Sequence, residues 1–178
     1  MNYTLPIKTY SRVLPAAVTQ APATSTLCAQ GQNEPPTAPD RAPGLQLVYV
    51  VENDRISSVI TELIVQKNLL GGDVRCFGNG QVAFEALAAA PRTGQAAPDL
   101  ILLDLDMPLM DGWEFLDALA GLTPAPCPCV FVLTSSINPT DLAKATAYPH
   151  VKGFFTKPLD AAGVARMQML LRGITAAA

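Results

Sequence analysis

From Leu45 onward the chain alternates short apolar runs with segments of helical period, and this alternation restricts the fold more than any other feature. The runs are rich in Val, Ile, Leu and Phe and cover residues 45–51, 73–77, 100–105, 129–134 and 151–155. Apolar residues between them fall at helical spacing, in the sets Ile56, Val59, Ile60, Leu63 and Ile64; Val82, Ala86 and Leu87; Trp113, Leu116 and Leu119; and Val164, Met167 and Leu171. Continuous apolar runs are typical of strands buried on both faces, and strands joined through helices lie parallel. The sequence therefore predicts an α/β fold, a doubly wound five-stranded parallel sheet with flanking helices.

The composition changes near Leu45. Residues 1–44 contain seven of the 16 prolines and show no strand or helix period. Such a segment buries too little apolar surface to offset its ordering entropy, so we expect a disordered Pro/Ala-rich N-terminal arm. Residues 45–174 have the size of one ordinary domain, and residues 175–178 are expected to form a short C-terminal tail.

The charge and the cysteines exclude several classes of protein. Twelve basic and 15 acidic residues give a formal net charge of −3, which argues against nucleic-acid binding by bulk charge. No uncharged apolar run approaches the roughly 18 residues that cross a bilayer, so we expect a cytoplasmic protein without membrane contact. Cys28, Cys76, Cys127 and Cys129 lack the pattern of a disulfide framework or a zinc site, and we expect reduced thiols.

Polar side chains stand where the predicted strands end. They are Glu52, Asn53 and Asp54 after the first run, Asp104 and Asp106 at the third, Thr134, Ser135 and Ser136 at the fourth, and Lys157 after the fifth. Ligands of such sheets bind at this carboxyl edge. Clustered carboxylates repel one another unless a hard cation such as Mg²⁺ neutralises them, while a lysine and a hydroxyl can receive an anion. Together these groups indicate phosphoryl transfer.

With these residues the sequence resembles the receiver domain of two-component response regulators, close to the stand-alone CheY-like kind. The resemblance extends over residues 45–174. Its motifs are Val-Val-Glu-Asn-Asp from Val50, Asn79-Gly80, Leu-Leu-Asp-Leu-Asp-Met-Pro-Leu-Met-Asp-Gly-Trp-Glu-Phe-Leu from Leu102, Leu-Thr-Ser-Ser from Leu133 and Phe-Phe-Thr-Lys-Pro from Phe154. It implies a flavodoxin-like (βα)5 fold with strand order 2-1-3-4-5.

The resemblance also implies a role for each site residue. Asp104 would accept a phosphoryl group from a phosphohistidine. Mg²⁺ would be held by Glu52, Asn53, Asp104 and the backbone carbonyl of Asp106. Thr134 and Lys157 would hold the phosphoryl oxygens, and Phe154 would move together with Thr134. Asp106 and Ser136 would tune the lifetime of the phosphorylated state.

The expected function is a phosphorylation-activated signalling switch of a two-component phosphorelay. The phosphoprotein would receive its phosphoryl group from a sensor histidine kinase or a phosphotransfer protein, and would signal by relay or by docking an unidentified downstream protein target. We expect no enzymatic activity beyond self-catalysed phosphotransfer and slow autodephosphorylation. The expected oligomeric state is a monomer or a weak phosphorylation-dependent dimer, with no nucleic-acid partner.

Two alternatives stay open at this stage. Asn53 departs from the family pattern, in which an acid is usual, and this neutral amide is the one feature that supports the alternative of a pseudo-receiver that binds proteins independently of phosphorylation. The run Leu-Leu-Asp-Leu-Asp also resembles the first motif of haloacid-dehalogenase-type phosphatases. In those enzymes this motif opens the domain, whereas here an acidic cluster precedes Asp104 by 52 residues. Two residues have structural interpretations as well, Asp54 as a helix cap and Phe154 as a packed aromatic.

Overall fold

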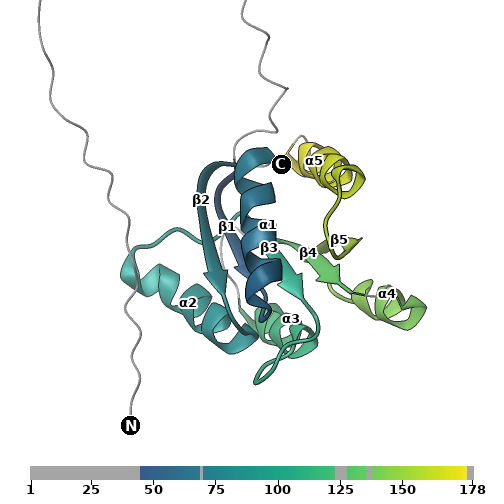
Figure 1. Cartoon of the computed structure of the whole chain (residues 1–178). Coiled ribbons are helices and arrows are strands. Elements are labelled where there is room, and N and C mark those ends of the chain that lie inside the picture. The colour runs from purple at the N-terminus through teal and green to yellow at the C-terminus, as the bar shows by residue number, and fades with distance from the viewer. Residues whose placement is uncertain (1–44, 69, 123–127, 136–137, 176–178) are drawn as a thin grey trace, which may run out of the picture. The chain divides into compact units, whose positions relative to one another are not determined.

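The computed structural model describes residues 45–68, 70–122, 128–135 and 138–175, and they form a parallel sheet between two layers of helices (Figure 1). The strands are β1 (Leu45–Val51), β2 (Leu70–Phe77), β3 (Leu100–Asp104), β4 (Cys129–Thr134) and β5 (Val151–Thr156). The helices are α1 (Arg55–Asn68), α2 (Gly80–Thr93), α3 (Gly112–Gly121), α4 (Pro139–Ala145) and α5 (Ala161–Thr175). The expectations for the arm at 1–44, for residues 176–178 and for Cys28 and Cys127 fall outside the described residues.

The strands are hydrogen-bonded in the order β2-β1-β3-β4-β5, and every neighbouring pair is parallel. This is the predicted order. Because each strand is followed by a helix that returns the chain to the opposite edge, all five carboxyl ends lie along one edge of the sheet. Figure 1 shows the arrowheads of β1, β2 and β3 directed toward that edge.

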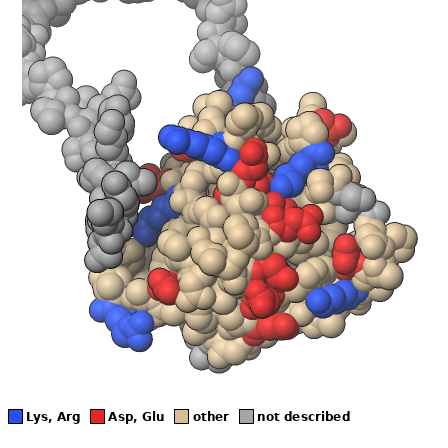
Figure 2. All heavy atoms as spheres, turned by 60° about the horizontal axis from the view of Figure 1, so that its bottom comes forward, with Lys and Arg blue, Asp and Glu red and all other residues tan. Residues whose placement is uncertain are grey.

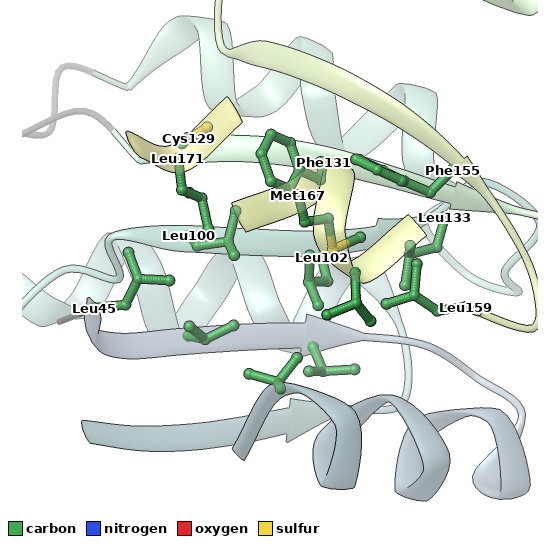
Figure 3. Close-up of a cluster of buried hydrophobic side chains, with 14 residues drawn as sticks. Leu45, Leu100, Leu102, Cys129, Phe131, Leu133, Phe155, Leu159, Met167 and Leu171 are labelled. Atoms are coloured by element: carbon green, nitrogen blue, oxygen red, sulfur yellow. The ribbon is translucent and has the colours of Figure 1, made fainter. Parts of the chain in front are cut away.

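Alternate residues of the central strands enter two separate cores. On one face, Val48, Leu102 and Phe131 pack with Val65 of α1 and Met167 of α5 (Figure 3). The other face packs against α2 and α3 through a second cluster, whose members include Tyr49, Ile101, Leu103, Ala83, Leu87, Phe115 and Leu116. Burial on both faces explains why these strands read as continuous apolar runs in the sequence.

The observed strands and helices differ most from the predicted ones at β2 and α4, while the ends of β3 and β5 shift by one residue. Strand β2 begins at Leu70, three residues before the predicted start at Asp73. The sequence pattern missed these first residues because they include glycine and show no apolar pattern. A Cβ on Gly72 would collide with the backbone carbonyl of Gln46, so this pairing requires glycine. Helix α4 was not marked by apolar spacing, since it has seven residues and buries only Ala145.

Helix α1 has the predicted period, but most of its apolar residues face away from the sheet. Its buried residues are Ser58, Thr61 and Val65. Ile56 is 71% exposed and Leu63 is 60% exposed, and Val59 and Ile60 are also exposed. The side of α1 that meets the sheet therefore combines Ser58 and Thr61 with Val65 and the partly buried Ile64, whereas the other four aliphatic side chains face solvent.

In the described part of the chain, no helix has the length and apolarity needed to cross a bilayer. Cys76 and Cys129 are free thiols, as predicted. Burial raises the pKa of both, that of Cys129 to about 11, so these thiols stay protonated at neutral pH.

Candidate functional site

The predicted site residues meet at the carboxyl edge of the sheet. Glu52 follows β1, Asp104 ends β3, Thr134 ends β4 and Lys157 follows β5. Glu52, Asp104 and Thr134 are only 4%, 2% and 3% exposed, although all three are polar. Burial of polar groups at the ends of three neighbouring strands costs free energy unless they are paired. Their burial together at this edge indicates a functional site.

Lys157 connects the two buried carboxylates. Its Nζ lies 2.8 Å from Oε2 of Glu52 and 2.8 Å from Oδ2 of Asp104. Residues far apart in the sequence are thus joined by one ammonium group, which donates to both acids. Two carboxylates and one ammonium leave the group with one net negative charge.

The pKa values of this group follow from burial and pairing. Burial raises the pKa of Glu52, and the hydrogen bond from Lys157 only partly opposes this effect. Burial acts to lower the pKa of Lys157, but its hydrogen bonds to Asp104 and Glu52 outweigh burial and place that pKa above its ordinary value. Lys157 is therefore a fixed positive charge at neutral pH.

Backbone hydrogen bonds hold these side chains in position. The Asp54 N–H donates to Oε1 of Glu52 at 3.0 Å, and the Asp106 N–H donates to Oδ1 of Asp104 at 3.4 Å. The Lys157 N–H donates to the carbonyl of Thr134 at 2.8 Å, which joins the ends of β4 and β5. The site is consequently fixed by the ends of four adjacent strands, as the sequence predicted from the sheet alone.

The loop after Asp104 is fixed by the start of α3. Asp111 and Glu114 form a capping box, in which each side chain accepts from the other residue's backbone N–H. The Gly112 N–H donates to the carbonyl of Leu105 at 3.0 Å, and a Cβ on Gly112 would collide with the backbone of Asp104 and Leu105. Only glycine allows α3 to begin this close to Asp104.

The residues between Glu52 and α1 have separate environments. Oδ1 of Asp54 accepts from the Ser57 N–H at 2.7 Å, so Asp54 caps α1, as predicted. That hydrogen bond lowers the pKa of the Asp54 carboxyl group. Asn53 is exposed and borders a hollow of about 270 Å³ together with Glu52 and Cys76.

Two of the predicted accessory residues lie near the site, and one lies outside the described residues. Asp106 is exposed beside Asp104, whereas Ser136 is not among the described residues. Phe154 is buried on β5, in a small cluster with Leu105 and with Ala145 of α4. This cluster connects the residue that follows Asp104 to α4 and β5.

Trp113 of α3 packs against the same cluster from outside. Its ring lies 6.0 Å from that of Tyr148, and the Nζ of Lys144 lies 4.2 Å from its centroid. The Tyr148 hydroxyl donates to Oδ1 of Asp117 at 2.7 Å. These contacts attach the end of α4 to α3, and the sequence pattern did not indicate them.

The donor set at this edge fits a hard divalent cation. The carboxylates of Glu52 and Asp104, the amide of Asn53 and the backbone carbonyl of Asp106 are all oxygen donors, and Mg²⁺ takes such ligands while keeping several waters. Within the described residues, no group of three or more His, Cys, Asp or Glu side chains is arranged to hold a metal. A cation here would therefore meet fewer carboxylates than a dedicated metal cage provides.

A feature that the sequence pattern did not indicate lies beside Lys157. A hollow of about 290 Å³ is lined by Ile60 and Thr61 of α1, by Ser135 and by Lys157 with the residues that follow it. The exposed aliphatic face of α1 therefore begins next to the ammonium group of the site. Figure 2, in which the bottom of Figure 1 comes forward, shows acidic side chains gathered in a band with basic side chains on either side.

Comparison with known proteins agrees with this geometry. The family model of the response regulator receiver domain matches residues 48–167, more than half of the chain. The probable methanogenesis regulatory protein FilR2 of Methanothrix harundinacea is 26% identical over 114 residues, which are 64% of this chain and 73% of that protein.

A protein-glutamate methylesterase/protein-glutamine glutaminase of Thiobacillus denitrificans is 45% identical over 90 residues, which are 51% of this chain but only 23% of that protein. The crystal structure of the phosphorylated cyanobacterial phytochrome response regulator RcpA aligns with a TM-score of 0.57 at 25% identity, covering 74% of this chain and 91% of that one. The matched residues include the four strand ends described above, and the chain belongs to the response regulator receiver domain family.

Proposed function

We propose that this protein is a phosphorylation-activated switch of a two-component phosphorelay and that Asp104 is its phosphoacceptor. The observation that carries the proposal is the buried Asp104 carboxylate, held 2.8 Å from the Lys157 ammonium group beside Glu52 and Thr134. A buried acid at the carboxyl edge of a receiver fold, with a cation and a hydroxyl beside it, is suited to phosphoryl transfer.

The reaction follows from these groups. An Asp104 carboxylate oxygen attacks the phosphorus of a phosphohistidine, the new O–P bond forms as the N–P bond breaks, and the imidazole leaves with the bonding electron pair. A carboxylate needs no general base for this step. Lys157 then pairs with a phosphoryl oxygen of the acyl phosphate, and Thr134 donates a hydrogen bond to another.

We assign the cation site to Glu52, Asn53, Asp104 and the Asp106 carbonyl. Bound Mg²⁺ would supply neutralising charge for the phosphoryl oxygens. The chain's own contribution is the acid, the ammonium group and the hydroxyl. Asp106 and the hydroxyl residue Ser136 are proposed to tune how long the phosphoryl group persists.

We propose that the donor protein docks on the exposed face of α1. Ile56, Val59, Ile60 and Leu63 form this face, and its hollow reaches Lys157. A donor must bring its phosphohistidine to Asp104, and an apolar surface next to the reacting groups supports binding at that place. The donor is a sensor histidine kinase or a phosphotransfer protein.

The output is proposed to pass through Phe154. Its ring packs with Leu105, which follows the acceptor, and with Ala145 of α4. A change at Asp104 and Thr134 would alter this packing and the surface of α4, β5 and α5, where a downstream protein would dock. We propose a monomer or a weak phosphorylation-dependent dimer that acts in the cytoplasm and does not bind nucleic acid.

The chain spans less than a quarter of the methylesterase relative, so that protein's activity is not carried over to this one. We propose a signalling protein with self-catalysed phosphotransfer and slow autodephosphorylation. Because the chain belongs to the receiver family, we do not propose the alternative of a haloacid-dehalogenase-type phosphatase. A second candidate function is a pseudo-receiver that binds its partner without phosphorylation. It is supported by Asn53, whose exposed amide is neutral where an acid is usual.

The test is incubation with a small phosphodonor and Mg²⁺, followed by intact mass measurement. We expect the wild type to gain one labile phosphoryl group, and we expect none with Asp104→Asn or without Mg²⁺. A wild type that stays unmodified at high donor and metal concentrations would contradict the proposal and favour the pseudo-receiver.

A further inference from the structure

The three residues that follow β1 all carry side-chain oxygen, but the structure gives each a different position. Glu52 is buried and accepts from Lys157. Asn53 is exposed, and Asp54 lies at the start of α1. Only the first of these oxygens is therefore already part of the charged group around Asp104.

The carboxylate of Asp54 is engaged elsewhere. Its Oδ1 accepts from the Ser57 N–H at 2.7 Å, while its own N–H donates to Oε1 of Glu52 at 3.0 Å. Turning this carboxylate toward the cation site would break the cap of α1 and leave a backbone N–H of the first turn without its acceptor. Asp54 is thereby prevented from replacing a missing acid at position 53.

Lys157 further lowers the charge that a cation would meet. Its ammonium group lies 2.8 Å from one oxygen of Glu52 and 2.8 Å from one oxygen of Asp104. A divalent cation must share these two carboxylates with a positive charge already present. The next donor along the chain is the Asn53 amide, which adds an oxygen and no charge.

We propose that Asn53 sets the divalent-cation affinity of this receiver and holds it low. The inference rests on the proposed function, because it concerns the cation site of the same acceptor. Replacing the amide by a carboxylate adds one negative charge next to Glu52 without changing the shape of the side chain. The neighbouring acid Asp54 contributes little to binding, since it caps α1.

The test uses Mn²⁺ as the probe, because the electron paramagnetic resonance signal of free Mn²⁺ reports binding without any phosphorylation step. The full chain is titrated as wild type, Asn53→Asp, Asp54→Asn and the double variant that exchanges the two residues. We expect Asn53→Asp and the double variant to bind about tenfold more tightly or better. Asp54→Asn, which keeps a good capping residue, should stay within about twofold of the wild type.

An Asn53→Asp variant with wild-type affinity would overturn the inference, and so would a tenfold loss in Asp54→Asn, which would make Asp54 a ligand. Circular dichroism melts test whether each variant is folded. If Asp54→Asn does not fold, Asp54→Ser serves as a second variant that keeps a capping side chain. Phosphorylation of the same set, read by intact mass, separates the two proposals. A wild type that is not phosphorylated by the donor contradicts the proposed function, whereas the Mn²⁺ titration alone decides the role of Asn53.

Discussion

Helices α1 and α5 cover the same face of the sheet, yet α1 turns most of its apolar residues away from it. Helix α5 buries Val164, Met167 and Leu171 against the strands. Helix α1 packs Val65 and part of Ile64 against the strands beside small polar side chains, and it turns four aliphatic residues, such as Ile56 and Leu63, to solvent. Apolar spacing therefore identifies a helix without showing which side meets the core, and an aliphatic face directed outward is available for a partner.

The largest effect should come from truncating matched aliphatic residues on the two helices. Met167→Ala removes a side chain with no exposed surface and should lower the free energy of unfolding by about 2–5 kcal/mol. Ile56→Ala should change it by less than about 0.5 kcal/mol, because Ile56 is largely exposed. Urea unfolding measures both, and equal losses would show that α1 packs its aliphatic face inward.

Enlarging the inner side of α1 should have the next largest effect. Val65 has no exposed surface where α1 faces the sheet. Val65→Phe adds volume to a packed position and should lower the free energy of unfolding by about 1–3 kcal/mol. The matched control is Leu63→Phe on the exposed side, for which thermal unfolding should stay close to that of the wild type. A stabilised Val65→Phe variant would contradict close packing at this position.

Substitutions on the exposed side of α1 should slow phosphoryl transfer from a protein donor but not from a small phosphodonor. Leu63→Ser should slow phosphoryl transfer from a phosphorylated histidine phosphotransfer protein by about tenfold, because it removes apolar surface from the proposed docking face. Modification by a small phosphodonor should keep its wild-type rate. Val82→Ser, an exposed aliphatic on α2, is the control. Equal slowing with both donors would place the defect in the site instead of in docking.

The smallest expected effect concerns the N-terminal caps, because α1 and α5 each begin with an aspartate that caps the helix. Asp54 caps α1, and Oδ1 of Asp160 accepts from the Gly163 N–H at the start of α5, both at 2.7 Å. The Asp54 pKa is lowered in the folded chain, so its contribution to stability is present above the unfolded pKa and is lost as pH falls through the folded value. The stability advantage of the wild type over Asp54→Asn should shrink as pH falls below about 4.

Urea unfolding of both chains at pH 7 and pH 3 measures this advantage. A difference that does not change with pH would contradict a charged cap at Asp54.

The parallel sheet and the gathering of the site residues could be predicted from the sequence, because buried parallel strands read as apolar runs and end along one edge. The strand order followed only from the resemblance to receiver domains. The cap at Asp54 was predictable for a local reason, since it lies next to its own helix. The outward face of α1 was not predictable, because its periodicity is the same in either orientation. Nor could the sequence show that Lys157 contacts both Glu52 and Asp104, since this depends on how far a flexible side chain reaches.

The contacts of Trp113 have a practical consequence. It is the single tryptophan of the chain, and it packs from α3 against the cluster of Leu105 and Phe154. Its indole lies near the Lys144 ammonium group and the ring of Tyr148, both of which affect emission. The proposed rearrangement of this cluster on phosphorylation of Asp104 should therefore change the ultraviolet fluorescence of Trp113, which can be followed in real time without a dye or a radioactive label.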